Sequence, residues 1–110
     1  MQIWDIEPHL LCNFHLQEQH DNIHALIHLL SQDVIYPPHP EVNRWKNKLS
    51  LLKEMHDLTA IELSRRGRSH ESSIYLNQIS ENEHSFQDIF VNTPEEQIIL
   101  LKEFSCPCFT

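Results

Sequence analysis

The chain has 110 residues, enough for one domain with one hydrophobic core. Hydrophobic residues make up 40% and charged residues 22%, as in globular proteins, and the single glycine disfavours a β-rich fold with many tight turns. The formal net charge of −8 with neutral histidines disfavours nucleic acid and anionic membranes at pH 7, although protonating all nine histidines would bring it to +1. No apolar run approaches the roughly 20 residues of a membrane span, so no membrane partner is expected.

The three cysteines are an odd number, and no signal-peptide pattern precedes them, which together predict a reducing cytoplasmic location. Cys12 is expected to be a buried free thiol. Cys106 and Cys108 flank a proline at the C-terminus, where a frayed tail is favoured over a metal ligand pair or a strained disulfide.

The first residues, Met1 to Glu7, are predicted to form a short extended arm that packs on the core. A helix is expected from about Pro8 to Ser31, with proline near its first turn. Its apolar residues recur at helical spacing and form one stripe, made of Leu16, Ile23, Leu26, Ile27 and Leu30.

Histidines line the edge of this stripe. His20, His24 and His28 are spaced i, i+4 and i+8, and neighbouring histidines at i, i+4 can chelate a divalent metal, here His20 and His24. A third ligand is available from His56, from His39 or from the C-terminal cysteines. In the alternative interpretation the rings only pack and bond backbone carbonyl groups. No other cofactor is predicted.

A second face of the same helix carries His15, Glu18 and Asn22, which are spaced i, i+3 and i+7 and therefore project together. This face holds the polar residues that are suited to chemistry.

A proline-rich loop from Ser31 to Pro40 is followed by a second predicted helix from about Pro40 to Arg66, which ends at Gly67. Tyr36 in this loop is an exposed candidate for stacking on a base, whereas Trp45 is expected in the core. The second helix carries six of the eight cations, which either follow a phosphate backbone or form a solvated face balanced by acids: Arg44, Lys46, Lys48, Lys53, Arg65 and Arg66.

The segment from Arg68 to Asn92 is less regular, with a short amphipathic piece expected near His84 to Phe90 whose apolar side chains face inward. A last helix is predicted from Thr93 to about Phe104, because Thr93-Pro94-Glu95-Glu96 is a capping box. Together these elements predict an all-α protein: a compact three-helix domain over residues 1–110, with the arm packed on the helices.

Several stretches resemble one family: MQIWDIEPHLLC at the start, HLxxxHxxxHA from His15, HPEVxRWxxKLxxL from His39, and RRGxxHxS from Arg65. In this order they are similar to small bacterial relatives of the phage endonuclease V family, the pyrimidine-dimer DNA glycosylases. The resemblance covers roughly the first two-thirds of the chain.

That resemblance implies an all-helical enzyme that removes a base at a cyclobutane pyrimidine dimer and cleaves the abasic site. An N-terminal amine, here that of Met1, would attack the sugar carbon and form an imine, since α-amino groups are partly unprotonated near neutral pH. A glutamate on the first helix would assist, with His15 and Glu18 on the same face. Phosphate contacts would come from Arg44, Lys48, Arg65 and Arg66.

The chain departs from the family pattern at two positions of the first predicted helix. Asn22 stands where the family pattern has the glutamate, and Asp21 where it has an arginine. An amide neither accepts a proton nor supplies a charge. Two hypotheses follow: a family member with degenerate or altered activity, or a non-enzymatic histidine-rich module that binds a divalent metal or a protein partner. Whether Glu18 replaces the missing carboxylate, or is a solvated helix residue, stays open.

Overall fold

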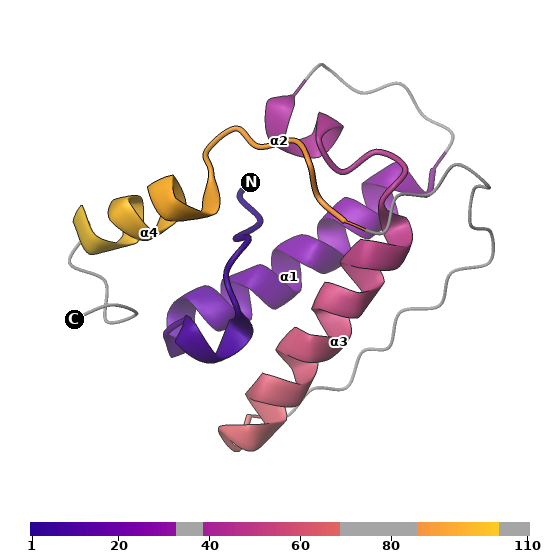
Figure 1. The fold of residues 1–110 in the computed structure, drawn as a ribbon. Coiled ribbons are helices and arrows are strands. Elements are labelled where there is room, and N and C mark those ends of the chain that lie inside the picture. Colours follow the sequence, from indigo (N-terminus) through magenta and orange to yellow (C-terminus); the bar gives the residue numbers. More distant parts are fainter. Residues whose placement is uncertain (33–38, 69–85, 104–110) are drawn as a thin grey trace.

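The computed structural model describes residues 1–32, 39–68 and 86–103 (Figure 1). Within these ranges the chain forms helices and no strand, which confirms the all-α prediction. The predictions for Tyr36, Cys106 and Cys108 lie outside the described residues. In chain order the elements are the 3-10 turn η1 (Pro8–Leu10), α1 (Asn13–Leu30), α2 (Pro40–Asn43), α3 (Leu49–Arg65) and α4 (Pro94–Glu103).

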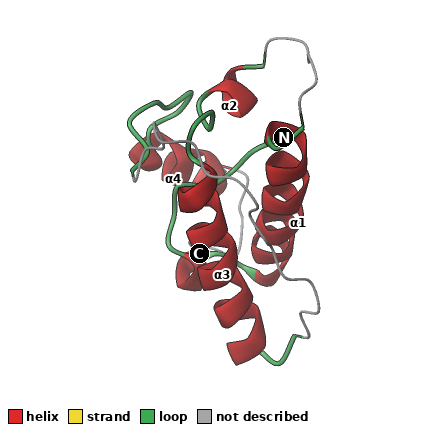
Figure 2. Ribbon diagram, turned by 90° about the vertical axis from the view of Figure 1, so that its right-hand side faces the viewer, coloured by secondary structure: helices red, strands yellow, loops and turns green. Residues whose placement is uncertain are grey.

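Two long helices, α1 and α3, pack side by side, as both views of the ribbon show (Figures 1 and 2). The N-terminal arm runs along α1, and α4 contacts the arm through a hydrogen bond from the Asp5 backbone N–H to Gln97, 2.7 Å long. The arm therefore contacts both α1, which follows it in the chain, and α4, which lies about 90 residues away. No helix in the described part of the chain is long and apolar enough to cross a membrane.

The first helix begins later than the sequence pattern predicted. After η1, Leu11 and Cys12 adopt extended backbone angles, and α1 starts at Asn13. The break turns Leu11 into the core, where its side chain is 2% exposed. Continuing the helix from Pro8 would have kept this leucine from the cluster that it now fills.

The predicted second helix is divided into α2 and α3. Asn47 has a positive φ of 61°, in the left-handed region that asparagine tolerates better than most residues. Three side chains close to this turn are buried, those of Arg44, Trp45 and Lys48.

Local signals at the helix ends are confirmed. Gly67 has a φ of 75°, and the amide of Arg68 donates to the carbonyl of Leu63 at 2.9 Å, closing α3 with a Schellman motif. At α4, Thr93 Oγ1 accepts from the Glu96 amide at 3.2 Å, and Glu96 Oε1 accepts from the Thr93 amide at 2.9 Å. These bonds form the predicted capping box and lower the pKa of Glu96.

The core consists of two clusters that the arm joins. Ile3 packs with residues of α1, α2 and α3, and Trp4 packs with Leu11, Leu16, Leu63 and Leu101. Consecutive arm residues thus point to opposite sides, as in an extended strand. The predicted α1 stripe is buried at its centre, and Trp45 is fully buried as predicted.

Some apolar residues that were expected to face inward are exposed. Residues 86–90 form no helix, and the prediction that Phe86, Ile89 and Phe90 face inward is wrong, since these side chains are 61%, 54% and 36% exposed. Leu58 and Ile61 on α3 are likewise exposed, by 48% and 58%. The segment 86–90 instead supplies polar partners for buried cations.

Arg44 is the main polar residue of the interior. Its Nη2 donates to Asp5 Oδ1 at 2.7 Å, to Glu41 Oε2 at 2.8 Å and to the carbonyl of Ile3 at 2.9 Å. Burial alone would lower the pKa of Arg44, but the hydrogen bonds and charges of Glu41 and Asp5 outweigh it and raise the pKa. The guanidinium therefore stays charged inside the protein.

Lys48 is buried in the same region. Its Nζ donates to the carbonyl of Arg44 and to Asp88 Oδ1, both at 2.9 Å, and its side chain is 2% exposed. Arg44 and Lys48, which the sequence analysis listed as phosphate contacts, are both buried and bond internal carboxylates and carbonyls, so we assign them a structural role.

We expect Arg44→Ala to lower the free energy of unfolding by about 3–5 kcal/mol, because it leaves two carboxylates without their buried partner. Arg44→Lys should recover little, since an ammonium cannot reproduce the planar fork of hydrogen bonds. Urea denaturation at pH 7 measures both. Arg65→Ala is the control: its side chain is 71% exposed, and it should cost less than about 1 kcal/mol. A loss for Arg44→Ala as small as that of the control would contradict the structural role.

Candidate functional site

Side chains of α1 determine where the first residues of the chain lie. Gln19 is buried, and its amide forms two 2.8 Å hydrogen bonds with Trp4, accepting from the N–H and donating to the carbonyl. One turn further along the helix, Asn22 Nδ2 donates to the carbonyl of Gln2 at 3.1 Å. Met1, 48% exposed, is thereby held one residue away from the Asn22 side chain.

A surface cavity of about 720 Å³ opens beside this contact. It combines one exposed aromatic ring, three amides, two carboxylates and one guanidinium, contributed by Asn13, Phe14, Gln17, Glu18, Asp21, Asn22 and Arg68. All but the last belong to α1. Glu18 and Asn22, which were predicted to share a face, therefore line the same cavity.

His15 packs beside the cavity and is not among the residues that line it. Its Nδ1 lies 3.1 Å from Cys12 Sγ, and its ring makes edge contacts with Trp4 and Phe14 at centroid distances of 5.7 and 5.2 Å. The imidazole is thus held between the arm and the start of α1. This geometry supports the packing of the arm against the start of α1.

The cations at the end of α3 differ in their surroundings. Arg65 is largely exposed and pairs with Glu62 at 3.0 Å, and Arg66 also pairs with Glu62, at 2.8 Å. Arg66 in addition donates to Asn13 Oδ1 at 3.1 Å and to the carbonyl of His9 at 3.2 Å, which ties α3 to the region before α1. Arg65 is therefore the more accessible of the two predicted phosphate ligands.

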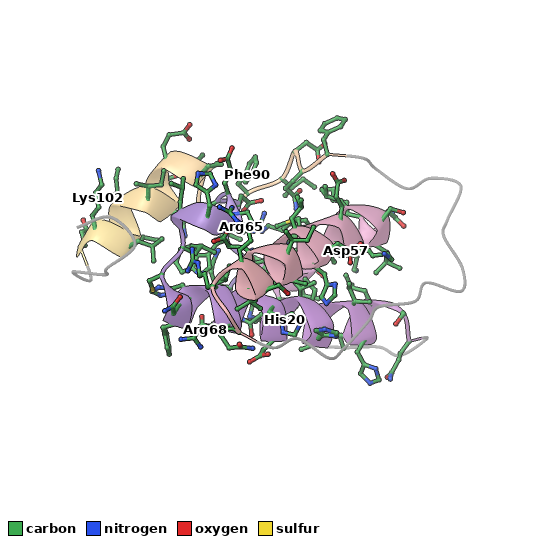
Figure 3. All side chains as sticks on the ribbon, turned by 90° about the horizontal axis from the view of Figure 1, so that it is seen from below. His20, Asp57, Arg65, Arg68, Phe90 and Lys102 are labelled. Carbon is green, nitrogen blue, oxygen red and sulfur yellow. The ribbon has the colours of Figure 1, made fainter. Side chains whose placement is uncertain are left out.

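Arg68 is a cavity residue that the sequence prediction missed. It follows Gly67, and the Schellman motif turns it toward α1, as the side-chain view shows (Figure 3). The RRG motif predicted the turn. The position of Arg68 beside Glu18 and Asn22 could not be predicted, because it results from the packing of α3 on α1.

A separate histidine cluster contains residues of α1 and α3, and Figure 3 labels one member, His20, where the two helices face each other. One ring nitrogen from each of His20, His24 and His56 lies within 4.8 Å of the other two. The predicted pair His20 and His24 is thus joined by His56, one of the third ligands considered from the sequence. This donor set is suited to a divalent transition metal.

The family model described as "Pyrimidine dimer DNA glycosylase" matches residues 1–76. The matched range contains the arm, α1, α2 and α3, and therefore every described residue of the cavity and of the histidine cluster. Comparison with curated proteins and with solved structures gives no match.

The arm contact yields a prediction of its own. Gln19→Leu should lower the free energy of unfolding by about 1–3 kcal/mol, because the buried N–H and C=O of Trp4 lose their partners. The Trp4 amide should then exchange its hydrogen faster, as hydrogen-exchange mass spectrometry or NMR would detect. Gln17→Leu is the matched control, since the side chain of Gln17 bonds the exposed Asp21 carboxylate, at 3.1 Å. Unchanged exchange at Trp4 would contradict the assigned role of Gln19.

Proposed function

The chain belongs to the pyrimidine dimer DNA glycosylase family, and from this premise we propose that it acts on abasic sites in damaged DNA, with an activity altered from that of the family pattern. The observation that carries the proposal is the 3.1 Å hydrogen bond from Asn22 to the carbonyl of Gln2, which keeps the first residue next to the cavity. The amine of Met1 is the proposed nucleophile.

The chemistry follows from an amine and a carboxylate beside an abasic sugar. The Met1 amine adds to the C1′ aldehyde and loses water, which gives an imine. A base then removes a proton from C2′, and the phosphate leaves C3′ with the electrons of the broken C–O bond, so the strand is cleaved. Glu18 is the proposed base, because it lines the cavity one turn before Asn22.

Removal of the damaged base is the step that we expect to be weakened. It develops positive charge on the sugar, which a carboxylate stabilises and the amide of Asn22 does not. Glu18 lies one helical turn away from that position. An altered preference, for abasic sites over intact dimers, is therefore consistent with the residues at the cavity.

Recognition of DNA is proposed for exposed residues at or near the cavity. Phe14 is 69% exposed and offers a ring for stacking on an unpaired base. Arg68 and Arg65 offer charges for phosphates. The formal net charge of −8 opposes binding, and two cations can neutralise few phosphates, so we expect weak affinity with a shallow dependence on salt.

Borohydride trapping on an oligonucleotide with a single abasic site tests the proposal. The wild type should form a covalent adduct and cleave the strand, and acetylation of the first residue should abolish both. Glu18→Gln should still form the adduct but cleave about 100-fold more slowly, because only the proton transfer is lost. Glu54→Gln, a change of an exposed carboxylate on α3, should have no effect.

Absence of an adduct with the wild type would refute the proposed activity. In that case an adduct formed by Asn22→Glu would identify the missing carboxylate as the cause. Equal cleavage by wild type and Glu18→Gln would remove Glu18 from the mechanism.

The second candidate function is a non-enzymatic helical module that binds a metal or a protein partner, and the histidine cluster favours it. DNA affinity at low salt, with and without a lesion, separates the two. Absence of binding to either DNA at both pH 6 and pH 7.5 would favour the module.

A further inference from the structure

His20, His24 and His56 form a compact nitrogen cluster between two helices. His20 and His24 are one turn apart on α1, and their Nε2 atoms lie 3.1 Å from each other. The ring of His56, on α3, lies 5.1 Å from that of His20 and 4.6 Å from that of His24, centroid to centroid. His20 and His56 are buried and His24 is half-buried, so the cluster is largely shielded from water.

These distances are close to those of a metal site. A tetrahedral zinc ion with Zn–N bonds of about 2.0–2.1 Å holds its ligand nitrogens about 3.3 Å apart. The Nε2 atoms of His20 and His24 need to separate by only a few tenths of an ångström to reach that spacing. All three nitrogens already lie within 4.8 Å of one another.

Two carboxylates orient the rings for this role. Nδ1 of His20 lies 3.2 Å from Asp21 Oδ1, and Nδ1 of His56 lies 3.0 Å from Asp57 Oδ1. A carboxylate that accepts a hydrogen bond from Nδ1–H fixes the tautomer and leaves the lone pair of Nε2 available. The two deepest histidines, one on each helix, therefore have the second partner that metal-bound histidines usually have.

We propose that His20, His24 and His56 bind one divalent transition-metal ion, with zinc as the expected metal and a water molecule in the fourth position. Three imidazole nitrogens suit zinc better than they suit magnesium or calcium, which prefer oxygen. The ion joins α1 to α3. The inference does not depend on the proposed DNA chemistry, because none of the three histidines is among the residues that line the cavity.

The experiment uses the full chain without a histidine tag, stripped with a chelator and then dialysed. Calorimetric titration should show one zinc ion bound per chain, and saturating zinc should raise the melting temperature. Cobalt(II), used as a spectroscopic probe, should give the intense visible bands of a tetrahedral site.

Variants connect the binding to these residues. His24→Ala should lose the zinc heat, the thermal shift and the cobalt bands; circular dichroism before metal addition checks that this half-buried position tolerates the change. Asp21→Asn should keep one site per chain and weaken it by about 10–100-fold, because the orienting carboxylate is lost. His28→Ala is the matched control: the same residue type, exposed, one turn further along α1, should leave all three readouts unchanged.

The proposal is overturned if the wild type gives neither heat nor a thermal shift with zinc. It is also overturned if His24→Ala binds zinc as tightly as the wild type, or if His28→Ala loses the binding. Should His24→Ala fail to fold, the cobalt spectrum of the wild type and the affinity of Asp21→Asn decide the matter: no tetrahedral bands together with unchanged affinity would refute the site.

Discussion

The structure depends on how a buried, extended segment satisfies its backbone. The arm has no neighbouring strand among the described residues, so side chains must supply its hydrogen bonds. Glu41 Oε2 accepts from the amide of Ile3, and Arg44 donates to the same residue's carbonyl, both at 2.9 Å. Gln19 bonds both the N–H and the carbonyl of Trp4, and Gln97 accepts from the N–H of Asp5. Helices from both ends of the chain are thereby joined through one short segment.

This arrangement changes what the cations of the chain can do. The charges of Arg44 and Lys48 are neutralised inside by Asp5, Glu41 and Asp88. Because these two cations are buried, this protein of net charge −8 has few accessible cations near the cavity. Association with DNA then depends on a few local contacts, because long-range attraction is absent. The fold and the proposed activity thus compete for the same basic residues.

The sequence predicted those features that depend on neighbours within a few residues. The capping box at Thr93, the stop at Gly67 and the burial of Trp45 all follow from local pattern. The roles of Arg44 and Lys48 were not predictable in this way, since their acidic partners Asp5 and Asp88 lie about 40 residues away and become partners only after the helices pack. The candidate sites divide similarly: spacing on one helix paired Glu18 with Asn22 and His20 with His24. Arg68 and the position of His56 required the packing of α3 on α1.

The bond between Asn22 and the arm has a consequence for how such a protein can evolve. The amide of Asn22 donates to the carbonyl of Gln2. A carboxylate at position 22 has no hydrogen to donate, so it would repel this carbonyl oxygen. A charged residue at this position would loosen the segment that carries the proposed nucleophile, whereas the asparagine that holds the segment supplies no charge. At position 22, a residue that stabilises the arm and a residue suited to catalysis are therefore different residues, as in other stability–activity trade-offs. The asparagine present in this chain favours an ordered N-terminal arm.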